Sequence, residues 1–224
     1  MATPRQAAGR GVALRSKRTR AGAITGGGTT GNERLTAASG AVLLVLLAAL
    51  GVTIIRIGQL LWLHLFLGML LIGPLALKLA STGYRFIRYY SGSVAYRRKG
   101  PPHALLRAMG PVVVLSTLIV LASGVALLFA GPSSRGTLLL IHKLTFFVWL
   151  AFVGLHVLVH LPSILPALRS DYGPTAGLSS DVSGRTGRTL ALAGALVGGL
   201  VLAVLVIPEF GPWLHASGHL HHHG

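Results

Sequence analysis

Six ionisable side chains interrupt the long apolar runs of this 224-residue sequence. An ionisable group is costly to hold within hydrocarbon, so each one is a candidate functional residue. Four of the six are histidines, and a neutral imidazole binds metals through a ring nitrogen. These residue types point first to a metal or metal-cofactor site. The six residues are His64, Lys78, His142, Lys143, His156 and His160.

The spacing of the later histidines places them along one helix face. His142 and His156 are 14 residues apart. At about 100° per residue they differ by about 40° around the helix, and the helical rise separates them by about 21 Å. His160 lies one turn beyond His156 on the same face, and it could replace His156 as a ligand.

His64 lies at the start of the second apolar run and His142 at the start of the fourth. These two runs are parallel, so the two imidazoles are expected at similar depth. Two imidazoles that face each other across a bundle can bind one haem iron from its two sides. The position 14 residues after His64 holds Lys78 instead of a histidine. His156 therefore lacks the matching partner, and His103 in the following loop is a further candidate.

Five apolar runs must position these residues, at roughly 35–55, 60–80, 108–130, 137–161 and 189–207. Each is close to the ~20 residues that cross about 30 Å of hydrocarbon. Hydrophobic residues make up 52% of the chain and charged residues 11%, against roughly 25% charged residues in a soluble domain. No run alternates polar and apolar residues, which disfavours strands. The sequence predicts an all-α polytopic transmembrane bundle, with a four-helix core and a fifth helix.

The basic residues predict the orientation and the domain organisation. They gather in the N-terminal tail and in the loops after the second and fourth spans, which share one side of a five-span chain. The positive-inside rule places that side in the cytoplasm and the C-terminus outside, as a multi-pass plasma (inner) membrane protein. The expected segments are a disordered basic cytoplasmic tail (1–33), the four-helix core (34–162), a cytoplasmic loop (163–188), the fifth helix (189–207) and a His-rich outer tail (208–224).

Composition excludes several kinds of chemistry. The chain has no cysteine, which excludes disulfides, thiolate nucleophiles, iron–sulfur ligation and c-type haem attachment. The net charge is +16, but the basic residues lie between apolar runs and do not predict binding of nucleic acid. No glycine-rich motif lies between a predicted strand and a helix, the context that nucleotide binding requires. The four acidic residues lie outside the apolar runs, which argues against a carboxylate pair in the membrane: Glu33, Asp171, Asp181 and Glu209.

Two histidines 14 residues apart on one helix, facing a histidine on a parallel helix, resemble the membrane b-type cytochromes. These include cytochrome b561-like and ferric-reductase-like proteins, and the resemblance covers about residues 35–161. It implies one or two haem b groups. His64 and His142 would bind an outer haem, and His156 or His160 would take part in an inner one. Lys78 is the departure from the two-haem pattern.

The resemblance also implies a function. The protein would carry electrons across the plasma membrane between a quinol or cytoplasmic donor and an outer acceptor, such as a periplasmic or extracellular redox protein. It could serve as the electron-transfer subunit of an oxidoreductase. Lys78 would then be a ligand, the partner of a haem propionate, or a side chain that extends its ammonium to the headgroups. A quinone site among the tyrosines of the cytoplasmic loop is a further expectation.

Two other functions fit the same residues. A proton or metal-ion transporter subunit would use the membrane histidines as a relay, although cation pathways usually contain Asp or Glu. A cofactor-free membrane anchor would use them for hydrogen bonds between helices. Gly194 and Gly198 have the GxxxG spacing of helix pairs and suggest a homo- or hetero-oligomer. His215 and His219 in the outer tail form a weaker candidate metal site.

Overall fold

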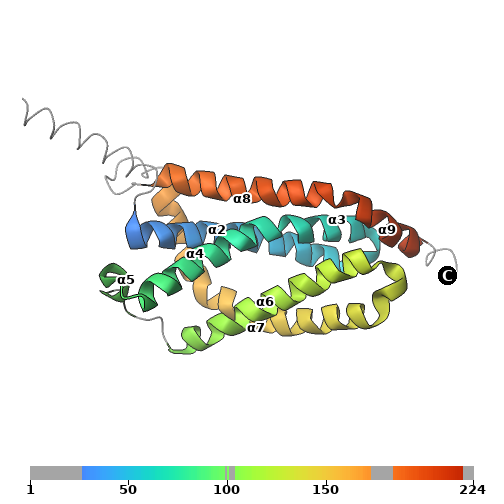
Figure 1. Ribbon diagram of the computed structural model, residues 1–224, viewed down its shortest axis with the longest axis horizontal. Helices are drawn as coiled ribbons and strands as arrows, with labels where there is room; N and C mark the ends of the chain where they lie inside the picture. The colour runs from blue at the N-terminus through green and yellow to red at the C-terminus, as the bar shows by residue number, and fades with distance from the viewer. Residues whose placement is uncertain (1–26, 99, 101–103, 173–183, 219–224) are drawn as a thin grey trace, which may run out of the picture.

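The computed structural model describes residues 27–98, 100, 104–172 and 184–218. Within these residues every regular element is helical, which confirms the all-α prediction (Figure 1). Helices satisfy their own backbone hydrogen bonds, as a segment within hydrocarbon must. The elements are α2 Gly28–Ile55, α3 Ile57–Leu70, α4 Ile72–Tyr90, α5 Val94–Arg98, α6 Ala104–Ala130, η1 Pro132–Ser134, α7 Arg135–Tyr172, α8 Arg185–Leu205, η2 Ile207–Phe210 and α9 Gly211–Gly218.

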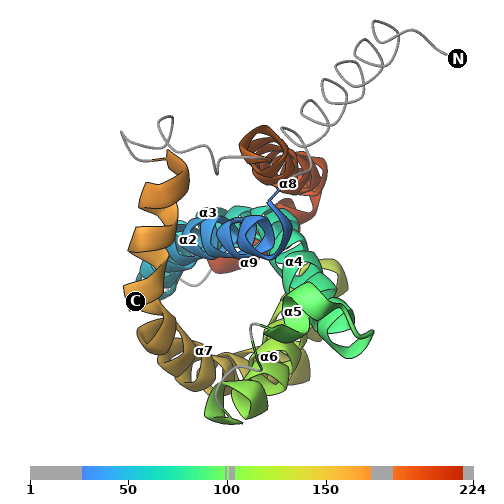
Figure 2. The same ribbon diagram turned by 90° about the vertical axis from the view of Figure 1, so that its left-hand side faces the viewer.

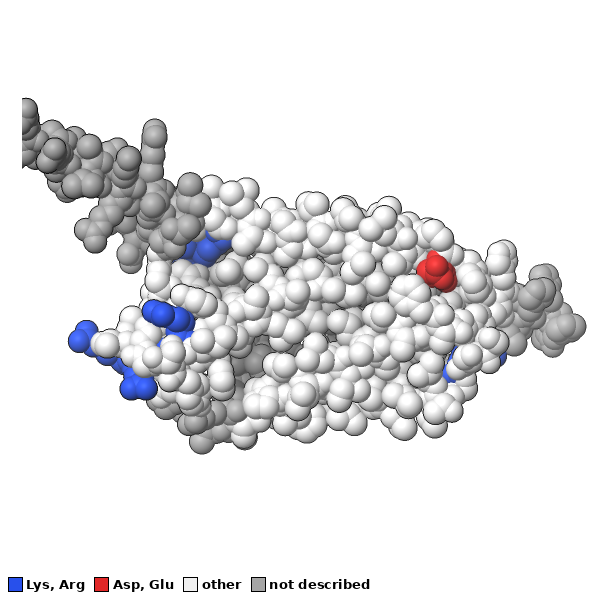
Figure 3. Space-filling model, viewed as in Figure 1, with Lys and Arg blue, Asp and Glu red and all other residues white. Residues whose placement is uncertain are grey.

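Five segments of the described chain are long and apolar enough to cross a membrane, which confirms the five predicted spans. Their bounds are Gly28–Ile55, Ile57–Tyr90, Ala108–Ala130, Pro132–Pro162 and Arg185–Leu205. The second segment contains both α3 and α4. On the face drawn in Figure 3, the basic side chains lie toward the two ends, with an uncharged surface between them, as expected for a multi-pass membrane protein.

Four spans enclose a central space, and the fifth lies outside it. Figure 2 shows α2, α4, α6 and α7 in a ring, with α8 beyond α2 and α4. Short connections join α2 to α3 and α6 to α7, so each pair is antiparallel. The helices α3 and α4 therefore run in the same direction as α7, and α4 lies across the ring from α7. We name the two ends of the bundle by the short helices there, the α5 end and the α9 end.

The second span is interrupted at Leu71, close to the Gly73–Pro74 pair from which a kink is expected. Pro74 has no N–H, so it cannot donate to the carbonyl of Leu70 as a helix requires. Helix α8 packs against this point. A Cβ atom on Gly199 would collide with the Leu70 carbonyl oxygen, and one on Gly73 would collide with the carbonyl of Ala195. Glycine therefore allows two backbones to touch here.

The GxxxG glycines of α8 do not make this contact. A Cβ atom on Gly194 or Gly198 would have no described atom within 4 Å, and both residues are exposed. The packing of α8 within the chain uses Gly199 instead. Pairing through Gly194 and Gly198 with another subunit stays a prediction.

Four helices extend beyond the predicted segments, and one of them is α8, which begins at Arg185 within the predicted loop. α2 begins at Gly28, so residues 28–33 are helical rather than part of a tail. α7 continues through Pro162 to Tyr172, into the predicted loop. Residues 211–218 of the predicted tail form α9. Residues 1–26 and 173–183 lie outside the described residues.

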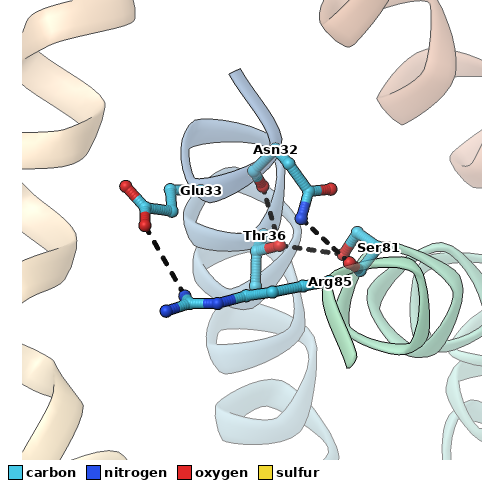
Figure 4. A network of polar contacts seen from close by, with 5 residues as sticks. All are labelled: Asn32, Glu33, Thr36, Ser81 and Arg85. Carbon is cyan, nitrogen blue, oxygen red and sulfur yellow. Dashed lines mark hydrogen bonds and ion pairs between the residues drawn. The ribbon is translucent and has the colours of Figure 1, made fainter. Parts of the chain in front are cut away.

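The early start of α2 has a polar cause, which Figure 4 shows. The Asn32 side-chain amide donates to the Ser81 carbonyl (3.0 Å), and the hydroxyls of Thr36 and Ser81 are 3.0 Å apart. Arg85 pairs with Glu33 at 3.6 Å. These contacts join the first turns of α2 to the last turns of α4. The sequence pattern missed them because they replace the apolar packing that marks a span.

Candidate functional site

A cavity of about 1030 Å³ runs along the inside of the ring. This volume is at the upper end of the roughly 300–1,000 Å³ typical of ligand pockets. Its walls come from α2, α3, α4, α6 and α7, and Trp213 of α9 lies at one end. Most of the lining is aliphatic. The predicted site residues of the spans all line this one cavity: His64, Lys78, His142, His156 and His160.

At the α9 end, His64 of α3 and His142 of α7 both line the cavity. The charge of a protonated His142 would act on His64, so the two rings are electrostatic neighbours. The common depth predicted from the sequence agrees with this arrangement. Both side chains are partly buried.

Each of these rings is held by a hydroxyl from the antiparallel neighbouring helix. Nδ1 of His64 lies 2.9 Å from Oγ1 of Thr53, and Nδ1 of His142 lies 3.0 Å from Oγ of Ser123. Thr53 belongs to α2 and Ser123 to α6. The two histidines therefore have the same environment, one in each helical hairpin.

The hydroxyls also determine which ring nitrogen carries the proton. The hydroxyl of Thr53 donates to the Leu50 carbonyl, and that of Ser123 donates to the Val120 carbonyl at 2.9 Å. A hydroxyl has one proton, so it accepts from the imidazole. Both rings are then Nδ1–H tautomers, and Nε2 keeps its lone pair. Nε2 of His64 has no hydrogen bond to another described residue, whereas the His142 ring has a further hydrogen-bonding contact with the Val120 backbone.

A glycine makes room for one of the rings. A Cβ atom on Gly124 of α6 would lie 3.1 Å from Cε1 of His142, closer than ordinary van der Waals contact. Gly68, one turn after His64, lines the cavity and has no described atom within 4 Å of its Cβ position. Gly154 has open space around it as well, but it does not line the cavity. Gly68 and Gly124 therefore keep the walls beside the two imidazoles flat.

The α5 end of the cavity has a different set of groups. Nζ of Lys78 donates to the carbonyl of Thr36 at 2.6 Å. It lies 3.0 Å from the position that a Cβ atom of Gly40 would occupy. His156 and His160 contact each other on α7, with ring centroids 4.5 Å apart and ring planes inclined by 54°. Two rings from adjacent turns of one helix cannot bind a metal from opposite sides, and no described histidine faces them across the cavity.

Trp149 lies between the two ends, seven residues from both His142 and His156. It lines the cavity, and its Nε1 donates to Oγ1 of Thr117 at 3.0 Å. Only 9% of its surface is exposed. Trp149 therefore marks the cavity wall midway between the histidine pair at the α9 end and the groups at the α5 end.

The other candidate residues lie outside this arrangement. Lys143 lines the α9 end but is exposed. His215 is exposed on α9, while His219 and His103 lie outside the described residues. The loop tyrosines do not line the cavity, and Tyr84 packs edge-to-face on Tyr96 at 6.1 Å.

Sequence reasoning missed the supporting residues Thr53, Ser123 and Gly124. A signal was available, because both hairpins repeat one order: a hydroxyl before the short connection and a histidine after it. A hydroxyl in a span often bonds to a carbonyl of its own helix. Its place in the sequence alone therefore does not predict a histidine partner. Comparison of the chain with protein-family models, with curated proteins and with solved structures returned no match.

Proposed function

We propose that this multi-pass membrane protein is a b-type cytochrome with one haem b, held between His64 and His142. The observation that carries the proposal is the matched pair of imidazoles, each with Nδ1 bonded to a hydroxyl and Nε2 left for a metal. Metal-binding histidines typically donate their other N–H to a neighbouring acceptor, which fixes the tautomer and orients the ring. When two histidines bind one iron, each of them needs such a partner.

The number of protein ligands favours haem over a bare metal ion. A haem iron needs only axial ligands from the protein, whereas structural zinc sites use four protein ligands and catalytic ones three. Within the described parts of the chain, no three His, Cys, Asp or Glu side chains come together as a metal site. Two imidazoles beside an apolar cavity therefore suit a flat, apolar macrocycle better than a transported ion.

The residues around the pair have defined roles in this proposal. His64 and His142 bind the iron, and Thr53 and Ser123 orient them. Gly68 allows the macrocycle to approach the helix backbone, and Gly124 makes room for the His142 ring. The bound haem would supply one-electron redox chemistry. Trp213 donates to the Leu128 carbonyl at 3.2 Å and helps to exclude water at the α9 end.

The proposed electron path rests on the predicted orientation of the chain. The basic loops predict that the α9 end faces outside and the α5 end faces the cytoplasm. The haem would then lie near the outer surface, where it can pass electrons to an outer acceptor or a periplasmic or extracellular redox protein. Its donor would be a quinol or a cytoplasmic reductant.

The test is the haem content of the purified, detergent-solubilised protein. We expect a b-type reduced-minus-oxidised spectrum with close to one haem per chain. His64→Ala and His142→Ala should both abolish it, while His215→Ala, at an exposed position on α9, should not. A colourless protein from cells supplied with haem would contradict the proposal, as would full haem content in both histidine variants.

A further inference from the structure

The α5 end of the cavity contains an ammonium group without a carboxylate partner. Lys78 lies within a membrane-spanning segment, and its Nζ donates one hydrogen bond, to the Thr36 carbonyl at 2.6 Å. An ammonium group has three N–H donors. No described carboxylate forms an ion pair with it. A cation buried between helices is costly unless it is paired, so this group can hold an anion strongly.

The other charged residues at this end also favour the binding of an anion. The described lining includes the cations Arg34, Lys78 and Arg85 against one carboxylate, Glu33. Glu33 contacts Arg85 at 3.6 Å. The lining therefore carries a net positive charge, before any charge on histidine is counted. Low-dielectric walls strengthen the attraction of such a site for an anion.

Two further donors lie across the cavity from Lys78. His156 and His160 of α7 line the same end, and the charge of Lys78 acts on both rings. The two imidazoles lie next to each other in a tilted arrangement, 4.5 Å between centroids, on the helix opposite α4. An oxyanion between α4 and α7 would accept hydrogen bonds from the ammonium on one side and from imidazole N–H groups on the other.

The cavity continues from these polar groups into an apolar section. Leu75 and Leu79 of α4 and Val153 and Val157 of α7 line it next to Lys78 and the histidines. The helices α4 and α6 make few close backbone contacts between their described residues, whereas α6 and α7 pack along their length. A ligand with an anionic head and an apolar body matches this combination.

We propose that Lys78, His156 and His160 form an oxyanion-binding site for the phosphate headgroup of an anionic phospholipid. Lys78 holds the phosphate as a charge partner, and the two imidazoles donate from α7. The apolar part of the ligand lies along the leucine and valine lining. The site is about 21 Å along the helices from the proposed haem site, and it does not depend on haem.

The experiment measures lipid and phosphate binding by the full chain. The protein is purified in a mild detergent and titrated with phosphatidylglycerol, with phosphatidylcholine or with inorganic phosphate, and bound molecules are counted by native mass spectrometry. Lys78→Met removes the charge at similar length, and Lys78→Arg restores it. Lys143→Met is the matched control, because it removes a lysine from the other end of the same cavity.

We expect about one tightly bound phosphatidylglycerol per chain, weakened at least about tenfold in Lys78→Met because a charge-assisted hydrogen bond is lost. Lys78→Arg should recover part of the binding, and Lys143→Met should leave it unchanged. Brominated phosphatidylglycerol should quench the fluorescence of Trp149, an effect lost in Trp149→Phe. If a lipid supplies the bound phosphate group, inorganic phosphate should compete with phosphatidylglycerol only weakly. Equal competition by phosphate would keep the oxyanion site but identify a free anion.

Two results would overturn the proposal. One is equal binding of phosphatidylglycerol by the original protein and a folded Lys78→Met variant. The other is loss of a second haem equivalent in Lys78→Met with lipid binding unchanged, which would assign Lys78 to a haem propionate. Because the experiment measures lipid binding, it can support the proposed lipid site even if the protein binds no haem.

Discussion

The Oγ of Ser123 lies 3.0 Å from Nδ1 of His142, while its own proton goes to the Val120 carbonyl. This relationship connects α6 to α7. It places the ring proton on Nδ1, so Nε2 keeps its lone pair. Thr53 and His64 repeat it between α2 and α3. An imidazole bonded only for helix packing would not need the same arrangement at the same depth in both hairpins. The pair is therefore the structural basis of the proposed haem site.

Ser123→Ala should weaken haem binding without unfolding the bundle. The substitution removes the acceptor that orients His142, and loss of such a supporting partner typically lowers metal affinity by about 10–100-fold. Haem titration of the apoprotein measures this change. Ser116→Ala is the control, because Ser116 lies on the same helix and bonds only to the Val113 carbonyl of its own helix. An equal effect of both variants would show that Ser123 has no special role.

Gly124→Val should reduce haem content more than Gly110→Ala. A side chain at Gly124 meets the His142 ring, because even its Cβ atom would lie 3.1 Å from Cε1. A Cβ atom on Gly110, which also lines the cavity, would have no described atom within 4 Å. The haem-to-protein absorbance ratio checks this prediction. Normal haem binding by Gly124→Val would show that the site does not need the space that Gly124 leaves for the His142 ring.

Gly199→Ala should destabilise the docking of α8. Its Cβ atom would collide with the Leu70 carbonyl, and overpacking of this kind typically costs about 1–3 kcal/mol. Thermal unfolding in detergent, followed by circular dichroism, measures the loss. Gly198→Ala is a strict control at the adjacent position, because its Cβ atom would have no described neighbour within 4 Å. Equal melting temperatures for both variants would argue against the close backbone contact.

The predicted orientation can be tested with single cysteines, because the chain has none of its own. Ser91 and Ser134 are exposed at opposite ends of the bundle, near α5 and within η1. In intact cells, a membrane-impermeant maleimide should label Ser134→Cys and should label Ser91→Cys only after lysis. The reverse pattern would place the proposed haem site on the cytoplasmic side.

The sequence predicted the five spans because each has the length and apolar composition that crossing a membrane requires. It also predicted a common position for His64 and His142, since short connections make the hairpins antiparallel. It did not reveal Thr53 and Ser123 as partners of these histidines. Those contacts depend on how helices rotate against each other, and helical periodicity leaves that rotation open.

The start of α2 was not predictable from hydropathy either. The residues before Leu35 are polar, and they remain helical because Asn32 and Thr36 bond to Ser81 of α4. Lys78 was recognised as a departure from the histidine pattern. Its bond to the Thr36 carbonyl and the room left by Gly40 are long-range contacts that no local signal marks.

Electron paramagnetic resonance of the oxidised, purified protein tests the central claim most directly, because it reports the axial ligands of the iron. We expect one low-spin ferric haem per chain with two imidazole ligands, converted to a high-spin or empty form in His64→Ala and in His142→Ala. A high-spin signal in the unsubstituted protein, or no haem at all, would contradict the proposed site.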